Sequence, residues 1–266
     1  MSKSLRFSGW RNQLAISWLA LLLLSAMVAP WLPLPFAPNH LDLDATIQPP
    51  GTGGHWLGTD SYGRDVLALL LFGARTALRL SLPAAVFTTL TGILLGGVAG
   101  YYRNSPLPID SLVTGLIAVI ASIPRLILVL ALAAVQPPSV TTLLVLLLCT
   151  YWIGPARLVR AEMLRIREMP YIEAVRAAGV PGYRILLRHA LPNTWRPALA
   201  VFPLSVASLI ALETTLSFLG VGLPPEVPSW GRLLATFAFD PTAWWLLVYP
   251  ATVLFATSLA LRQLSQ

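Results

Sequence analysis

Residues 13 to 31 read QLAISWLALLLLSAMVAPW, a long run without a charged side chain. An apolar run of about 20 residues, if helical, spans the hydrocarbon core of a bilayer. Lys3, Arg6 and Arg11 precede it, as positive charges also precede the apolar core of a secretory signal. Ala29 is followed by Pro30, which disfavours cleavage after this small residue. We therefore expect an uncleaved membrane helix.

The composition of the whole chain supports a membrane protein. Of its 266 residues, 56% are hydrophobic and only 11% are charged, whereas about a quarter of the residues are charged in a typical soluble domain. The net charge is +7 and Lys3 is the only lysine. In a membrane protein such a balance indicates basic cytoplasmic loops rather than nucleic-acid binding. The single cysteine, Cys149, allows no intrachain disulfide and is expected in the core.

Further apolar runs follow the first one and predict an all-α integral membrane protein with six transmembrane helices. The predicted spans are residues 13–31, 80–102, 111–135, 141–155, 198–219 and 242–261. Gly92, Gly96 and Gly100 place a strip of glycine on one face of the second span, where another helix backbone can approach closely. We expect this strip to serve packing within the chain; a subunit contact is the alternative.

The distribution of positive charge predicts the orientation. Most arginines lie in segments on the same side as the N-terminus, and cytoplasmic segments carry the excess of Lys and Arg. Both termini are therefore expected in the cytoplasm, as residues 1–12 and 262–266. A single transmembrane domain is expected over 13–261, with an outer loop at 33–75 and a cytoplasmic loop at 157–196.

The cytoplasmic loop contains EAVRAAGVPGYRILLRHALPN, residues 173 to 193. Helical periodicity predicts two short helices, over 170–178 and 183–191. Gly179, Pro181 and Gly182 separate them, and Pro192 is expected to end the second. From the residues alone, such a basic helix–turn–helix fits DNA contact, a lipid surface or a groove on a partner protein.

Spacing within this loop resembles the E-A-A motif of ABC importer permeases, E-A-A, three residues, G, nine residues, I, one residue, L-P. The positions that match it are Glu173, Ala174, Gly179, Leu191 and Pro192. Val175 replaces the third motif residue and His189 stands at the Ile position. Three longer stretches, residues 57–78, 154–179 and 213–231, also resemble permeases of the dipeptide, oligopeptide and nickel subfamily.

The resemblance implies one permease subunit of an ATP-driven importer in the bacterial inner membrane. It implies a second homologous permease, two ABC ATPase subunits and an extracytoplasmic substrate-binding protein as partners, with membrane lipid around the helices and no nucleic acid. The ATPase-coupling residues would be Glu173, Ala174, Arg176, Ala177, Gly179, Leu191 and Pro192. Di- or oligopeptides are the expected substrates, with nickel or a metal chelate and antimicrobial peptides as alternatives.

No catalytic centre, metal site or directly bound cofactor is expected in this chain. GTGGHWLG (51–58) is rich in glycine but lacks the lysine of a phosphate-binding loop, so ATP should be used by partner subunits. His40, His55 and His189 show no metal-ligand spacing. A membrane-anchored DNA-binding regulator is the alternative from another functional class. An intramembrane hydrolase is disfavoured because no nucleophile–base motif is present.

Two ionisable residues, Glu213 and Arg125, fall inside predicted spans. Such groups face a bundle interior or a wet cavity, so both are candidates for the translocation path or for a structural pair. Arg157, Arg160 and Arg165 are candidates for contact with lipid phosphates. Trp230, Trp244 and Trp245 are expected at the membrane interface.

The predicted outer loop carries a second motif, formed by Gly58, Asp60, Gly63, Arg64 and Asp65. A structural turn is the favoured interpretation, and contact with the binding protein is the alternative. Asp60 is expected to cap a helix that begins near Ser61.

Overall fold

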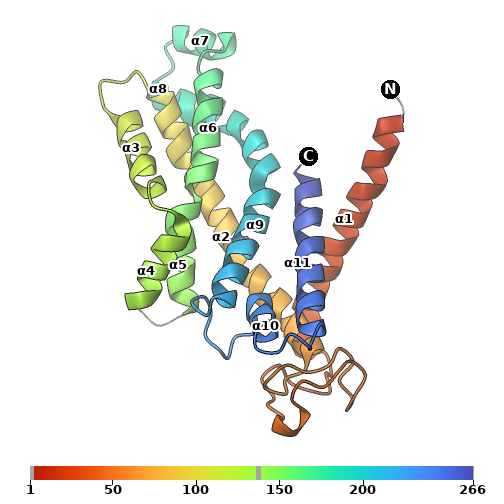
Figure 1. Cartoon of the computed structure of the whole chain (residues 1–266). Coiled ribbons are helices and arrows are strands. Elements are labelled where there is room, and N and C mark those ends of the chain that lie inside the picture. Colours follow the sequence, from red (N-terminus) through yellow and green to blue (C-terminus); the bar gives the residue numbers. More distant parts are fainter. Residues whose placement is uncertain (1–2, 136–138, 266) are drawn as a thin grey trace. The chain divides into compact units, whose positions relative to one another are not determined.

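The computed structural model describes residues 3–135 and 139–265, and its secondary-structure elements are all helices (Figure 1). Among these described residues, five helical stretches are long and apolar enough to cross a membrane, and a shorter apolar helix accompanies them. The chain divides into two compact units. Unit 1 comprises Met1–Leu82, Ala133–Leu144 and Val206–Gln266, and unit 2 comprises Pro83–Leu132 and Val145–Ser205.

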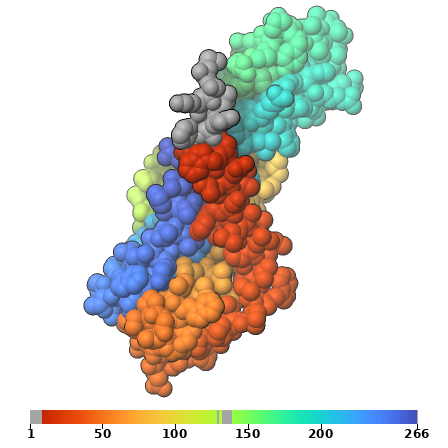
Figure 2. Space-filling view, turned by 90° about the vertical axis from the view of Figure 1, so that its right-hand side faces the viewer, coloured from red at the N-terminus to blue at the C-terminus, as the bar shows by residue number. Residues whose placement is uncertain are grey.

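Unit 1 is built around the two ends of the chain. Helix α1 (Lys3–Val28), extended by the 3₁₀ turn η1 (Ala29–Trp31), packs along α11 (Trp245–Leu264), as Figures 1 and 2 show. The Trp18 indole nitrogen donates to Thr257 Oγ1 at 3.1 Å, and Gln263 Nε2 donates to Asn12 Oδ1 at 3.1 Å. Both predicted terminal spans are therefore helices, and they pack against each other.

Helix α2 (Val66–Tyr101) is 36 residues long and begins well before the predicted residue 80. The preceding loop therefore ends near residue 65 rather than at 75. Asp65 Oδ1 accepts the Ala68 backbone N–H at 2.8 Å, so Asp65 caps this helix. The prediction that Asp60 caps a helix starting near Ser61 was wrong, because the turn after Asp60 comes first. Pro83 lies inside the helix, at the boundary between the two units.

The glycine strip of α2 packs within unit 2 against α6 (Ile153–Ile166). A Cβ added at Gly92 would lie 2.5 Å from Pro155 Cβ, and one added at Gly96 would lie 2.3 Å from the Ala156 carbonyl oxygen. Gly100 would meet the Arg160 carbonyl at 2.8 Å. Real Cβ atoms do not come this close to a backbone, so glycine is required for this contact. The strip therefore serves packing within the chain, as the sequence favoured.

The close packing at Gly96 predicts a clear difference between two Gly→Ala substitutions. Gly96→Ala should destabilise the protein by about 1–3 kcal/mol, because the methyl group must displace α6. Gly115→Ala is the matched control: a Cβ there meets nothing within 4 Å, so helix propensity should make it neutral or stabilising by about 0.5–1 kcal/mol. Thermal unfolding of the purified variants measures both. Equal melting temperatures would contradict the packing described here.

The predicted third span, 111–135, is not one helix. Helix α3 (Ile109–Ala121) ends before Ser122, and α4 (Arg125–Val135) begins after Pro124. The Ser122 backbone N–H still bonds to the Ala118 carbonyl, but proline donates no N–H and disfavours helical geometry in the residue before it. The prediction of one span from hydropathy was therefore wrong, because the backbone forms two separate helices, α3 and α4.

Helix α5 (Val140–Tyr151) runs on into α6, so that Val140–Ile166 forms one apolar helical stretch. The predicted cytoplasmic loop consequently begins near residue 167 rather than 157. The last long helix before α11 is α9 (Trp195–Phe218), which contains Pro203 close to the last boundary between the units, after Ser205. Cys149 is exposed on α5, which corrects its expected place in the core.

A short helix, α10 (Trp230–Phe237), was missed by the sequence reading. Ser229 caps it, with Oγ accepting the backbone N–H groups of Gly231 and Arg232. Trp230 is 1% exposed and its indole donates to the Leu70 carbonyl at 3.0 Å, while a Cβ at Gly73 would lie 2.7 Å from its ring.

Two of the three tryptophans expected at the membrane interface are buried in unit 1. Besides Trp230, Trp245 is 5% exposed and donates from its indole to the Thr59 carbonyl at 3.0 Å. Both side chains are enclosed by protein, because each indole finds a backbone acceptor far away in the sequence. Trp244 is exposed, at 51%.

Candidate functional site

The segment between α6 and α9, residues 167–194, holds the E-A-A-like residues and lies wholly in unit 2. Its first helix, α7 (Pro170–Ala177), matches the predicted 170–178 closely. Pro170 occupies the first turn, where its missing N–H has no helical partner to lose. Glu173 lies in the first turn and Arg176 in the last, and both signs suit the helix dipole. We call residues 167–194 the α6–α9 connection.

Helix α7 ends at a left-handed glycine. Gly179 has φ +79°, and the Val180 N–H reaches back to the Val175 carbonyl at 3.4 Å. The Gly179 N–H bonds to the Arg176 carbonyl at 3.0 Å. Glycine adopts this backbone conformation without the steric penalty of a side chain. The glycine of the motif is thus needed for its φ, since a Cβ there meets nothing within 4 Å.

The two faces of α7 differ sharply. Ile172 is fully buried and belongs to a cluster that also contains Met163 and Ile185. Val175, which departs from the E-A-A pattern, is half-buried against the same cluster. The opposite face is exposed and consists mostly of small or charged residues: Glu173, Ala174, Arg176, Ala177, Ala178 and Gly179. The connection therefore presents an exposed helix face of small and charged side chains, and the opposite face of the same helix is packed in the buried cluster.

The second part of the connection is continuous with α9, contrary to the prediction that Pro192 ends a separate helix. Helix α8 (Gly182–Ile185) passes into a π-helical turn, η3 (Leu186–Ala190), then a 3₁₀ turn, η4 (Leu191–Thr194), and then α9. The wider turn ahead of Pro192 makes room for a ring that would clash in a regular α-helix. Gly182–Phe218 is in effect one long helical stretch.

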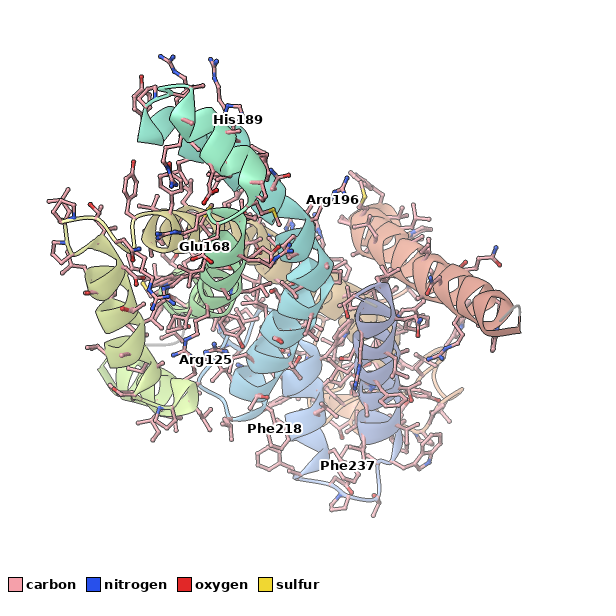
Figure 3. All side chains as sticks on the ribbon, turned by 90° about the horizontal axis from the view of Figure 1, so that it is seen from above. Arg125, Glu168, His189, Arg196, Phe218 and Phe237 are labelled. Atoms are coloured by element: carbon pink, nitrogen blue, oxygen red, sulfur yellow. The ribbon has the colours of Figure 1, made fainter. Side chains whose placement is uncertain are left out.

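Side chains stabilise this irregular turn. Asn193 Nδ2 donates to the His189 carbonyl at 2.6 Å, and the Tyr171 hydroxyl, at the start of α7, contacts the same oxygen at 3.4 Å. His189, labelled in Figure 3, takes the Ile position of the motif and is half-buried. Leu191 packs against the cluster that contains Ile172. Its Cδ1 atom would lie 2.5 Å from a Cβ added at Gly97. Pro192 is exposed.

The connection is also tied to the end of α2. Arg167 Nη1 donates to the carbonyl oxygens of Gly100 and Tyr101, at 3.4 and 3.3 Å. These bonds satisfy acceptors that the last turn of a helix leaves open. The α7 surface is therefore attached to α2 through Arg167, and to α9 through η3 and η4.

Two of the three arginines that are candidates for lipid contact form ion pairs within the chain. Arg160 binds Asp110 with two hydrogen bonds of 2.6 Å each, from Nε and Nη2. Arg165 pairs with Glu162 three residues earlier. Arg157 is exposed on α6.

Glu213 and Arg125, the two candidates for the translocation path, have different surroundings. Glu213 is 2% exposed in α9 and accepts a hydrogen bond from Ser217 Oγ at 2.8 Å. Arg125, labelled in Figure 3, begins α4; it is exposed, and its guanidinium carbon lies 4.3 Å from the centre of the Tyr151 ring. Glu213 and its partner Ser217 both belong to unit 1. Arg125 and Tyr151 both belong to unit 2.

The motif in the loop before α2 forms a tight buried turn in unit 1. Asp60 is fully buried and accepts the backbone N–H groups of Tyr62 and Arg64 at 2.9 Å each. Its Oδ2 accepts Arg64 Nε at 2.8 Å and Nη2 at 2.7 Å. Gly63 has φ +71°, and a Cβ there would overlap the Asp42 carbonyl. This arrangement supports the structural interpretation.

The other residues of this motif anchor the turn to its surroundings. Asp65, besides capping α2, contacts His55 Nδ1 through Oδ2 at 2.9 Å, and the His55 ring stacks on Phe36 with centroids 4.0 Å apart. Gly58 has φ +81°, and a Cβ there would lie 2.6 Å from the Gln48 carbonyl oxygen. Within residues 3–135 and 139–265 no group of three His, Cys, Asp or Glu could hold a metal ion.

Removal of the Asp60 carboxylate should unfold this loop. Asp60→Ala leaves the buried Arg64 charge unpaired and two backbone donors unsatisfied, so we expect a loss of about 3–5 kcal/mol of local stability. Limited proteolysis and melting temperature report the loss. Asp44→Ala, at an exposed carboxylate of the same loop, should change stability by less than about 0.5 kcal/mol. Similar protease resistance in both variants would contradict a structural role for Asp60.

Comparison with known proteins identifies a family and several relatives. Residues 92–266 match the family described as "Binding-protein-dependent transport system inner membrane component". A putative peptide transport system permease of Brucella suis is 34% identical over 245 residues, covering 92% of this chain and 81% of the relative. The dipeptide transport system permease DppC of Bacillus subtilis is 35% identical over 261 residues, covering 96% and 79%.

Two further relatives extend the comparison. The oligopeptide transport system permease OppC of Mycobacterium bovis is 35% identical over 249 residues, covering 92% of this chain and 84% of that protein. A chain of the inward-facing MetNI methionine ABC transporter shares the fold, with a TM-score of 0.55 and 20% identity over 74% of this chain and 97% of that one.

The helices, the connection and these matches agree. The protein is a multi-pass, helical inner-membrane protein and the permease subunit of an ABC importer. It is not catalytic and binds no cofactor of its own; a partner ATPase hydrolyses ATP, and a binding protein also belongs to such systems. The chain therefore belongs to the family of binding-protein-dependent transport system inner membrane components.

Proposed function

We propose that this permease carries di- or oligopeptides into the cell and that the exposed face of α7 receives the ATPase. The carrying observation for the coupling role is the contrast between the two faces of α7, with Ile172 buried and Ala174 and Ala177 open. A small-residue helix face allows close seating in a groove of a partner. The peptide substrate is supported by the names of the relatives, which transport peptides, dipeptides or oligopeptides.

Force transmission through this connection follows from its attachments. The Ile172 cluster fixes α7 to α6, and the continuous stretch from Gly182 to Phe218 joins the connection to α9. A packed core transmits displacement because it deforms little. Movement of a seated ATPase would therefore move α6 and α9 with α7, as a rigid element in an alternating-access cycle. Leu191 would hold the end of the connection and Pro192 its irregular turn.

The assembly that we propose has two homologous permeases, two ATPases at their cytoplasmic connections and a binding protein on the outer side. Both termini and the α6–α9 connection would face the cytoplasm, and the loop before α2 would face outward. Helices α3 and α4 together would make the remaining membrane crossing, so that 13–261 forms one permease domain. Single cysteines at residues 44 and 176, in a protein whose exposed Cys149 is replaced by serine, test this orientation by labelling with a membrane-impermeant reagent on intact spheroplasts. Reaction at 176 only would overturn it.

Glu213 and Arg125 are proposed to line the path between the two permeases. Glu213 supports this by its burial beside Ser217 near the end of α9, since buried carboxylates in membrane helices face a protein interior. Cysteines at 213 and 125 in the assembled importer should react with a small water-soluble reagent in at least one state of the cycle. Protection in every nucleotide state would remove both residues from the path.

Uptake in a defined system tests the function as a whole. The importer, co-expressed with its neighbouring subunits and reconstituted in proteoliposomes with its binding protein, should accumulate labelled dipeptide or tripeptide only when ATP is supplied. Nickel, a nickel chelate and a cationic antimicrobial peptide are the competing substrates in parallel vesicles. Accumulation of one of these without peptide uptake would replace the proposed substrate. Specific DNA binding by the purified protein, instead of co-purifying ATPases, would overturn the coupling role.

A further inference from the structure

A cavity of about 570 Å³ lies within unit 1, between the end of α9, helix α10 and the loop before α2. Its volume is in the range of sites that enclose small organic molecules, roughly 300–1,000 Å³. Most of its lining is apolar and includes Leu219, Phe239 and Phe218, the last labelled at the end of α9 in Figure 3. None of the residues with a proposed coupling role contributes to it.

Two arginines contribute the positive charge of this cavity. Arg64 is 7% exposed and held by Asp60, as described above. Arg232, on the first turn of α10, is half-buried and donates from Nη2 to the Leu223 carbonyl at 2.5 Å. Its Nε is buried and has no hydrogen-bond partner among the described residues. The charge of Arg232 is therefore balanced less well than that of Arg64, which has a buried carboxylate of its own.

The electrostatic setting of Arg232 agrees with this imbalance. Burial, and then repulsion by Arg64, lowers the pKa of the Arg232 guanidinium from its ordinary value, and Glu226 and Tyr62 oppose this shift. Glu226 is exposed at the cavity lining, so water screens its charge. An anion beside Arg232 would relieve both the repulsion and the missing acceptor.

We propose that this cavity binds the free C-terminal carboxylate of the transported peptide through Arg232. Arginine presents a planar fork of N–H donors that matches a carboxylate. The exposed Glu226, at the lining of the same cavity, offers a partner for a peptide ammonium group. A terminal carboxylate is the one anionic group that short peptides share whatever their side chains, and the apolar walls would accept varied side chains. This inference rests on the peptide substrate proposed above.

A pair of ligands that differ only at the carboxylate tests this assignment. Trialanine and trialanine amide would be titrated into the detergent-solubilised importer complex without its binding protein, by ligand-detected NMR. Trialanine should bind on the order of tenfold more tightly than the amide, as expected for a lost charge-assisted hydrogen bond. Arg232→Gln should abolish this preference, Arg232→Lys should keep part of it, and Arg262→Gln, at an exposed arginine of α11, should retain it in full.

Two results would overturn the proposal. One is equal affinity of the wild-type complex for both ligands, and the other is an unchanged preference in Arg232→Gln. If Arg232→Gln keeps the preference and also weakens attachment of the binding protein, Arg232 belongs instead to a contact with an acidic side chain of that protein. If Arg232→Gln does not fold, Ala235→Trp serves as a second variant. It narrows the cavity and should reduce the affinity for both ligands by the same factor.

Uptake by the wild-type importer separates this inference from the proposed function. If proteoliposomes accumulate trialanine but the complex does not distinguish it from its amide, the carboxylate site alone is wrong. If they accumulate no peptide under conditions in which another substrate is taken up, the peptide function is wrong, and the carboxylate assignment falls with it.

Discussion

Gly179→Asp should abolish ATP-driven uptake while the protein stays folded and in the membrane. The residue has φ +79°, which aspartate tolerates better than most side chains, and its Cβ would enter open space within this chain. A loss of function would therefore come from what seats on α7. A side chain and a negative charge at a tightly packed helix–groove contact typically cost 2 kcal/mol or more, so uptake should fall by at least about tenfold.

The control for this variant is Gly51→Asp, in the loop before α2. Gly51 has φ +87°, and a Cβ there also meets nothing within 4 Å, so the backbone change is matched. Uptake in proteoliposomes and co-purification of the ATPases are measured for both variants. Wild-type uptake by Gly179→Asp would show that the α7 end does not take part in coupling. Equal losses in both variants would point to backbone strain instead of docking.

Trp230→Ala should destabilise unit 1 by about 3–5 kcal/mol. The side chain is 1% exposed, and its removal leaves a cavity beside Gly73 and an unpaired Leu70 carbonyl. Helix α10 depends on this anchor, so the position of Arg232 should be lost as well. Trp230→Phe keeps most of the volume and should lose about 1 kcal/mol, the value of the hydrogen bond.

The matched control is Trp56→Ala, because Trp56 is 74% exposed. Its replacement should shift the melting temperature little. The readouts are thermal unfolding of the purified protein and protease sensitivity of the 219–244 region. If Trp230→Ala melts like the wild type, the close packing of α10 against α2 is not a source of stability. If Trp56→Ala is the more damaging change, the loop before α2 has contacts beyond those described.

The glycine strip and the buried turn at Asp60 show that local features could be predicted from the sequence, whereas their partners could not. Gly92, Gly96 and Gly100 recur every four residues, and such a strip needs a close backbone neighbour. The sequence could not identify that neighbour as α6, because pairing of helices depends on the full chain path. The turn that contains Asp60 and Arg64 could be foreseen from Gly63. The cap of α2, however, is Asp65 and not the predicted Asp60, five residues earlier.

The sequence by itself determined the membrane class, the all-helical fold and the α7 helix with its glycine end. Each of these depends on local information: the length of an apolar run, or a residue that only one backbone geometry suits. The E-A-A spacing likewise marked the connection before any contact was known.

Tertiary structure decided the rest. Proline chemistry alone explains the break before Pro124, but only packing could show that the chain remains helical through Pro192. At this second proline, Asn193 and Tyr171 contact the backbone oxygen of His189. Only packing could bury Trp230 and Trp245, whose indoles find carbonyl acceptors more than a hundred residues away in the chain. The physical reason is that hydropathy describes each segment alone, whereas buried polar groups must be satisfied by whichever partner the fold brings near.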